Sequence, residues 1–158
     1  MTVQISVIGG SEANEPTLAR AEQIGYVLAC AGAVTVTGGL GGVMAAACRG
    51  AKSAGGLTVG ILPGCDPAAA NEWVDVIIPS GLGEARNALV VSSAAAVIAV
   101  GGEYGTLSEI ALALRAGIPV IGVDTWRLSR SDGEGDTKVI RVSDPFAAAA
   151  EALRLASP

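Results

Sequence analysis

Arg86 and Glu109 are the two charged residues of this chain whose types and surroundings could support chemistry on a small ligand. Glu109 ends the stretch GGEYGTLSE, and Arg86 lies in GEARNALV. A carboxylate can orient water or stabilise a developing positive charge. A guanidinium can bind phosphate or a base nitrogen. Both are therefore candidate residues of a site for a phosphorylated molecule.

Each of these residues also has a structural interpretation. Thr106 and Glu109 form a capping-box pattern, in which the two ends of a first helical turn satisfy each other. Arg86 could instead be a solvated surface residue. Asn87 could bind a ligand or cap a helix, and Tyr104 could stack on a base or pack. From the residues alone, capping is the simpler role for Glu109 and ligand binding the better one for Arg86.

Three glycine-rich turns supply the second signal. Glycine leaves no Cβ between backbone N–H groups and a phosphate, and the helix after each turn offers unpaired donors. One such turn is often needed only for geometry, but three together predict a phosphate site. No GK[ST] follows any of them, and GGSEANE is not GxGxxG, so neither a Walker A loop nor a dinucleotide cofactor is expected. The candidate residues are Gly9, Gly10, Gly38, Gly39, Gly41, Gly42, Gly101, Gly102, Gly105 and Thr106.

Apolar runs predict strands at 3–8, 33–37, 57–62, 74–78, 95–100 and 119–123, with an edge strand at 138–142. Helices are predicted from Pro16, which suits a first helical position, to 31, and at 43–54, 85–94 and 106–116, with a last helix to about 155 that Asp144 caps. This alternation predicts an α/β fold, with one Rossmann-like, doubly wound, mostly parallel sheet covered by helices on both faces. A single domain over 1–158 would then place the glycine turns at the carboxyl ends of the strands, where such sheets bind ligands.

Composition excludes several functions. The net charge is −5 without a basic block, which argues against a nucleic acid as partner. The chain has no histidine, so Ser-His-Asp chemistry and most metal sites are excluded, and we expect no metal and no resident cofactor. The N-terminus lacks a signal peptide and no apolar run is long enough to span a bilayer, so we expect a cytoplasmic protein with no membrane partner.

With these motifs in place, the sequence resembles the SLOG superfamily. The stretches TGGLGGVMAAACRGAKSAGGLTVGILPG, GEARNALV and GGEYGTLSE carry the likeness, which extends over about residues 3–123. The superfamily includes the Lonely Guy (LOG) phosphoribohydrolases and many proteins labelled "possible lysine decarboxylase". The chain is most similar to the short bacterial branch that includes molybdenum-cofactor carrier-like proteins.

The LOG pattern is PGGxGTxxE, with an arginine fifteen positions before its proline. Aligned on Gly105 and Thr106, Glu109 matches the motif glutamate and Arg86 the arginine. The resemblance thus implies an active-site role for both. Glu103 departs from the pattern, because it puts a carboxylate where the family has glycine, beside the expected phosphate. Further departures are Leu89 and Ala95, which stand where LOG enzymes carry acidic residues.

Two functions follow from the resemblance. The first is a nucleoside 5′-monophosphate phosphoribohydrolase for AMP or a cytokinin nucleotide, with Arg86 and Glu109 as catalytic residues. The second is a non-catalytic carrier for molybdenum cofactor or a related phosphorylated pterin, which the three departures favour. Pyridoxal-phosphate decarboxylation is not expected, since neither Lys52 nor Lys138 faces the glycine turns. Relatives assemble, so a homo-oligomer, a dimer or tetramer, is also expected.

Overall fold

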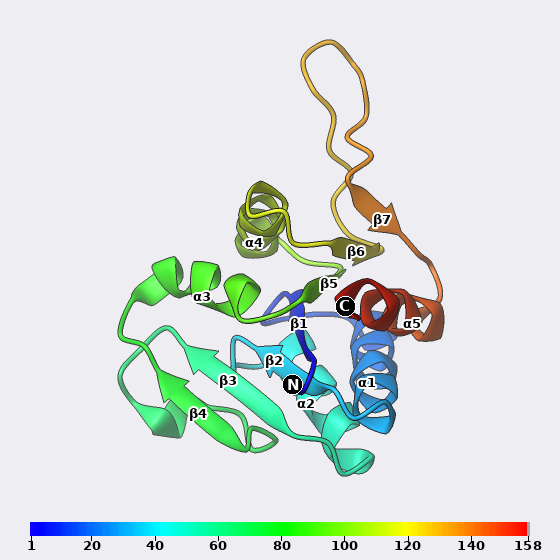
Figure 1. Cartoon of the computed structure of the whole chain (residues 1–158). Coiled ribbons are helices and arrows are strands. Elements are labelled where there is room, and N and C mark those ends of the chain that lie inside the picture. The colour runs from blue at the N-terminus through cyan, green and yellow to red at the C-terminus, as the bar shows by residue number, and fades with distance from the viewer. Residues whose placement is uncertain (158) are drawn as a thin grey trace.

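The computed structural model describes residues 1–157, and seven parallel strands form its centre (Figure 1). Their order across the sheet is β4-β3-β2-β1-β5-β6-β7, and each neighbouring pair is parallel. The predicted Rossmann-like α/β class is therefore confirmed, including the edge strand. The strands are β1 (Gln4–Gly9), β2 (Val34–Thr37), β3 (Thr58–Leu62), β4 (Val76–Pro79), β5 (Ala96–Val100), β6 (Val120–Val123) and β7 (Val139–Arg141).

Helices cover both faces of this sheet (Figure 1). On one face, α1 (Glu15–Cys30), α2 (Val43–Ser53) and α5 (Pro145–Ala156) pack on β1 and its neighbours. On the other face lie α3 (Asn87–Ser92) and α4 (Tyr104–Arg115). Two 3₁₀ turns, Pro67–Ala69 and Gly83–Arg86, complete the elements. None of the helices in residues 1–157 is long and apolar enough to cross a membrane.

Side-chain caps explain where two of the helices begin. Asn14 Oδ1 accepts the N–H of Thr17 at 3.0 Å ahead of α1, and Asp144 accepts the N–H of Ala147 at 2.7 Å ahead of α5. Both helices also carry proline in the first turn, where its missing N–H costs nothing. These starts agree with the expectations from sequence.

The helix predicted at 85–94 is wrong in extent. The chain forms a 3₁₀ turn up to Arg86, and α3 then ends at Ser92. The Ser93 hydroxyl donates to the Leu89 carbonyl at 2.6 Å, so a side chain competes for the backbone acceptor at the end of the helix. The short α3 leaves Arg86 at the junction of the two turns rather than inside a helix.

The first two helices meet along glycines. A Cβ on Gly25 would overlap the Ala47 carbonyl, and one on Gly50 would overlap the Glu22 carbonyl. The two backbones therefore lie in direct contact, which fixes the position of α2 against α1 and the sheet. The first residues of α2 lie at the carboxyl edge of the strands, because α2 follows β2 after a short turn.

The strand order places a crevice between β1 and β5. The chain leaves β1 toward β2, β3 and β4, and later fills the other side through β5, β6 and β7. At such a switch point the loops after the two central strands diverge and leave room for a ligand. At the ends of β1 and β5 the two backbones lie close together, because a Cβ on Gly9 would lie 2.6 Å from the Val100 carbonyl oxygen.

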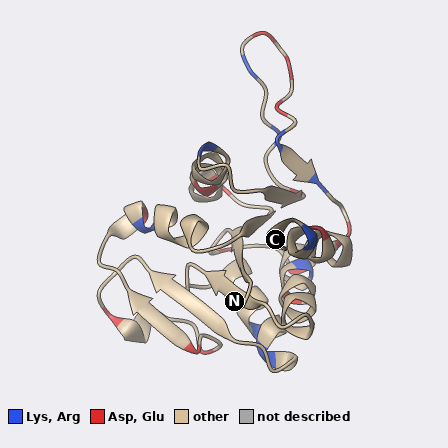
Figure 2. Ribbon diagram, viewed as in Figure 1, with Lys and Arg blue, Asp and Glu red and all other residues tan. Residues whose placement is uncertain are grey.

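One edge of the sheet exposes apolar side chains. All four residues of β4 are exposed, and Figure 2 shows that this strand carries no charge. Leu82, three residues after β4, is a large apolar side chain that is 53% exposed. Uncovered edges of this kind favour association. Homo-oligomer formation remains a prediction, and this edge is one exposed apolar surface that an assembly would bury.

Candidate functional site

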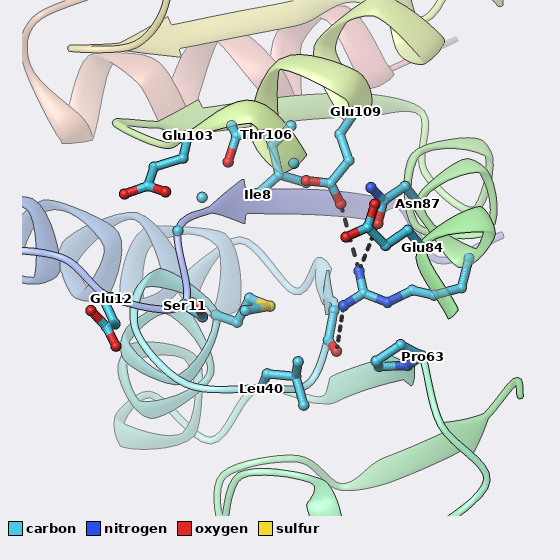
Figure 3. A pocket seen from close by; sticks show the side chains of 16 residues that line it. Ile8, Ser11, Glu12, Leu40, Pro63, Glu84, Asn87, Glu103, Thr106 and Glu109 are labelled. Carbon is cyan, nitrogen blue, oxygen red and sulfur yellow. Dashed lines mark hydrogen bonds and ion pairs between the residues drawn. The ribbon is translucent and has the colours of Figure 1, made fainter. Parts of the chain in front are cut away.

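A cavity of about 340 Å³ opens at the switch point between β1 and β5 (Figure 3). Its size lies within the range of small-molecule sites. It receives side chains from the turn after β1, the turn after β2, the 3₁₀ turn before α3 and the start of α4. The lining residues are Ile8, Gly9, Gly10, Ser11, Glu12, Gly38, Leu40, Met44, Pro63, Glu84, Arg86, Asn87, Glu103, Gly105, Thr106 and Glu109.

Arg86 is the only basic residue among these, and it is 7% exposed. Its guanidinium lies flat against Gly38, where a Cβ would be 2.6 Å from Nη1. It donates to Asn87 Oδ1 at 3.1 Å and weakly to the Gly38 carbonyl at 3.4 Å. The Nε atom is buried and has no partner within residues 1–157. Burial lowers the pKa of Arg86 below its usual value, against the opposing effect of the Glu109 carboxylate.

Glu109 faces this guanidinium from α4 and is 6% exposed. Its Oε1 lies 3.8 Å from Arg86 Nη1, an ion pair too long for a hydrogen bond (Figure 3). Burial raises the pKa of Glu109 to about 7, and the positive charge of Arg86 lowers it only in part. The carboxyl is therefore about half ionised near neutral pH.

The capping-box interpretation of Thr106 and Glu109 is wrong. Because α4 begins at Tyr104, two residues earlier than predicted, Thr106 is its third residue and Glu109 its sixth. Glu103 holds the N-cap position, and no side chain caps this helix. Glu109 is thus a buried carboxyl directed into a cavity, with no structural role at the helix end.

The turn after β2 is held by side chains from both sides. Thr37 Oγ1 accepts the N–H of Gly39 at 3.1 Å. Asn71 Nδ2 donates to the carbonyls of Gly39 and Leu40 at 3.2 and 2.8 Å. These bonds keep the turn in one conformation beside the cavity, which Gly38 and Leu40 line.

The turn after β5 is held in a similar way. Thr125 Oγ1 donates to the Gly101 carbonyl at 2.6 Å, and Trp126 Nε1 donates to the Glu103 carbonyl at 3.0 Å. The Tyr104 ring lies 5.4 Å from the Trp126 ring, centre to centre, and remains 78% exposed. Tyr104 therefore packs on Trp126 outside the cavity.

Backbone donors from two helices are available to a ligand. In α2, the N–H of Val43 donates to the Gly10 carbonyl at 3.0 Å, and the next two find no acceptor in the described chain. In α4, the first N–H that donates to a carbonyl of the preceding turn is that of Leu107, which donates to the Glu103 carbonyl at 2.9 Å. Such groups bind anions, aided by the helix dipole. The available donors are the N–H groups of Met44, Ala45, Gly105 and Thr106.

Carboxylates outnumber cations in the cavity. Glu12, Glu84 and Glu103 line it together with Glu109, against the one Arg86. Figure 3 shows Glu84 and Glu109 on the arginine side and Glu12 and Glu103 at the far end. They do not converge, since residues 1–157 contain no group of three or more side chains placed to hold a metal ion. The cavity therefore suits a ligand with several hydrogen-bond donors as well as an anionic group.

The structure brings together only part of the predicted site. Eight candidates line the cavity: Gly9, Gly10, Gly38, Arg86, Asn87, Gly105, Thr106 and Glu109. Six others lie outside its lining, and a ligand-binding role for them remains a prediction: Gly39, Gly41, Gly42, Gly101, Gly102 and Tyr104. Positive φ angles at four of these glycines show a conformational need instead. Lining residues that the sequence did not indicate are Ile8, Ser11, Glu12, Leu40, Met44, Pro63 and Glu84. For Ser11, Glu12, Leu40 and Pro63, the position one to three residues after a strand was the available signal.

The raised pKa of Glu109 predicts a pH-dependent stability. Between pH 4.5 and about 7 the folded protein keeps a proton that the unfolded chain has lost, so stability falls as pH rises. From pH 5.5 to 8 we expect the free energy of unfolding to fall by about 2 kcal/mol. Urea denaturation at both pH values measures this. Glu109→Gln should show almost no slope, and an equal slope in both proteins would contradict the burial of an ionisable carboxyl.

Comparison with known proteins was consistent with this geometry. A solved molybdenum cofactor binding protein from Rippkaea orientalis is 37% identical and covers 98% of this chain and 96% of its own, with a TM-score of 0.85. A molybdenum cofactor carrier protein from Chlamydomonas reinhardtii is 35% identical over 98% of both chains, also with a TM-score of 0.85. An uncharacterised protein from Archaeoglobus fulgidus is 49% identical over 115 residues, 73% of this chain and 76% of its own. The model of the SLOG cluster4 family matches residues 2–149, and the chain therefore belongs to that family.

Proposed function

We propose that this protein binds and carries molybdenum cofactor or a closely related phosphorylated pterin. The observation that carries the proposal is the full-length similarity to two solved proteins named for that cofactor, in fold and in more than a third of residues. The cargo combines a pterin ring, a metal-binding dithiolene and a phosphate. It therefore needs a site with hydrogen-bonding groups for the ring and donors for the anion.

The residues of the cavity fit such a cargo. The buried Nε of Arg86 has no acceptor in the described chain, and the first N–H groups of α2 and α4 are available. Buried donors without partners cost stability, so their presence in one cavity favours a ligand that supplies acceptors. The phosphate would be held best at the start of α2, because Glu103 stands at the start of α4. Leu89 is exposed away from the cavity, consistent with a site that lacks the acidic residue of LOG enzymes.

A second candidate is hydrolysis of the N-glycosidic bond of a nucleoside 5′-monophosphate. The specific observation for it is the buried Arg86–Glu109 pair within the cavity. A carboxyl with a pKa of about 7 could exchange a proton with water or with a leaving base near neutral pH. Against this candidate stands Glu103, which would oppose a nucleotide phosphate at the motif turn.

One purification distinguishes the two functions. From a host that makes molybdenum cofactor, the protein isolated without oxygen should contain molybdenum and pterin in near-equal amounts. Elemental analysis and fluorescence of the oxidised pterin measure them, and a host strain that cannot make the cofactor is the control. Failure to bind the cofactor, either from the host or when added, would contradict the carrier function. Release of ribose 5-phosphate from AMP would instead support the hydrolase.

A further inference from the structure

Glu109 is a buried carboxyl that lacks any hydrogen-bond donor in the described chain. It is 6% exposed, its nearest cation is 3.8 Å away, and it does not cap its helix. Nearly all buried polar groups in proteins are hydrogen-bonded, because an unpaired one costs free energy. Figure 3 shows its oxygens directed into the cavity. A ligand with N–H donors would supply the hydrogen bonds that no residue of the described chain gives to Glu109.

Arg86, beside it, presents the opposite chemistry. Its guanidinium carries five N–H donors, of which one goes to Asn87 and one, weakly, to Gly38. Asn87 holds the guanidinium in place from the same turn. The donors that remain require acceptors, and Nε has none among residues 1–157.

Along this wall of the cavity, two acceptor oxygens are thus followed by a set of donors. The complementary edge of a ligand offers two adjacent N–H donors followed by a carbonyl. A 2-amino-4-oxopyrimidine ring has this edge, in its amino group, its ring N–H and its carbonyl oxygen. Pterins contain that ring, and guanine presents the same order of groups.

We infer that Glu109 and Arg86 recognise the 2-amino-4-oxopyrimidine edge of the ligand, with Glu109 as the specificity-determining residue. Glu109 accepts from the amino group and the ring N–H, and Arg86 donates to the carbonyl. This inference rests on the proposed function, since it assigns the pterin ring of the cargo to the arginine side of the cavity. The phosphate then lies toward the turn after β2 and the start of α2.

The electrostatics of the wall support this orientation. A phosphate placed against Glu109 and Glu84 would meet two carboxyl groups, whereas a neutral ring with N–H donors is attracted to them. Binding of such donors also stabilises the ionised form of a carboxyl whose pKa burial has raised to about 7. The ring supplies hydrogen bonds that no residue of the described chain gives to Glu109.

The test compares GMP with IMP, two probes that differ only in the 2-amino group. By calorimetry, wild-type protein should bind GMP about 10-fold or more tightly than IMP, since a bidentate contact gives roughly that discrimination. In Glu109→Gln, one acceptor becomes a donor that opposes the amino group, and the GMP preference should fall to about 1. The matched control is Glu103→Gln, which removes a carboxylate from the far end of the same cavity. It should strengthen binding of both probes and keep the ratio.

Equal affinities of the wild type for GMP and IMP, or an unchanged ratio in Glu109→Gln, would overturn the inference. Neither result depends on whether molybdenum cofactor co-purifies with the protein. If the cofactor is bound but GMP and IMP bind equally, the assignment of Glu109 and Arg86 to the pyrimidine edge is wrong and the carrier function stands. If the protein prefers GMP but holds no cofactor, the assignment is right and the cargo is another ligand with this edge. A thermal melt of each variant confirms that it is folded.

Discussion

Arg86→Met is expected to reduce the affinity for the GMP probe by about 100-fold or more while the protein stays folded. The variant keeps an unbranched apolar stem at a position that is 7% exposed, but it is shorter than arginine and loses every donor. The charge-assisted donation from the guanidinium to the ligand carbonyl disappears, and each such hydrogen bond is worth roughly 1.5–3 kcal/mol. Calorimetry with GMP measures the loss. The molybdenum content of protein from a cofactor-producing host should fall in parallel.

Stability separates this effect from misfolding. Burial lowers the pKa of Arg86, so the charged group is held at a cost that methionine removes. The loss of Arg86 raises the pKa of Glu109 further, and that carboxyl becomes neutral. We therefore expect the melting temperature at pH 7 to stay the same or rise. Arg86→Lys is the matched control, since it keeps the charge without the planar fork. Its affinity for GMP should lie between those of the wild type and of Arg86→Met. An Arg86→Met affinity within threefold of wild type would show that the guanidinium does not touch the ligand.

Gly42→Ala is expected to destabilise the protein by about 4 kcal/mol or more, or to prevent folding. Gly42 immediately precedes α2 with a φ of +60° and a ψ of −130°, a conformation that residues with a Cβ avoid. A Cβ there would also collide with the backbone of Gly10 and Ser11, which cannot rotate away as a side chain could. The variant would have to move the start of α2 away from the turn after β1. Urea denaturation, or the soluble yield, measures the effect.

The neighbouring glycine is the control for this variant. Gly41 has no positive φ, and its nearest contact for a Cβ is the Ser11 carbonyl oxygen at 3.3 Å, which needs only a small shift. Gly41→Ala should therefore cost about 1 kcal/mol or less. A similar loss of stability in both variants would mean that the backbone conformation of Gly42 is not the reason why the turn excludes side chains.

The central strands could be predicted because most of them are runs rich in valine, isoleucine and alanine with glycine or proline at one end. Both faces of the sheet are covered, so its strands need no polar alternation, and 96–100 is buried at every position. Helix ends were harder to predict. The residues before α4 are compatible with either turn or helix. The carbonyl of the N-cap residue Glu103 accepts from Trp126 Nε1, a contact with a distant part of the chain that local sequence does not indicate.

The sequence indicated the charged pair of the candidate site, but it did not indicate which residues line the cavity. Arg86 and Glu109 are 23 positions apart, and the family spacing led to the pair that the fold brings within 3.8 Å. The glycine turns indicated the region where the structure has its cavity, but they included glycines outside its lining, because a glycine needed for a positive φ looks the same in sequence as one that approaches a ligand. Glu12 and Glu84 were missed because their signal is only a position after a strand, and the sequence contains many acidic residues.

The excess of carboxylates in the cavity has a consequence for the speed of loading. The chain carries a net charge of −5, and four of its glutamates surround the entrance and walls of the cavity, so an anionic cofactor approaches against a repulsive field. Added salt screens that field beyond a Debye length of about 8 Å at physiological ionic strength. The association rate constant should therefore rise as salt is added, whereas it falls for partners of opposite charge. The same field delays more highly charged metabolites, such as nucleoside triphosphates, still further. Selection by charge thus begins at the encounter, before any contact with Arg86 is made.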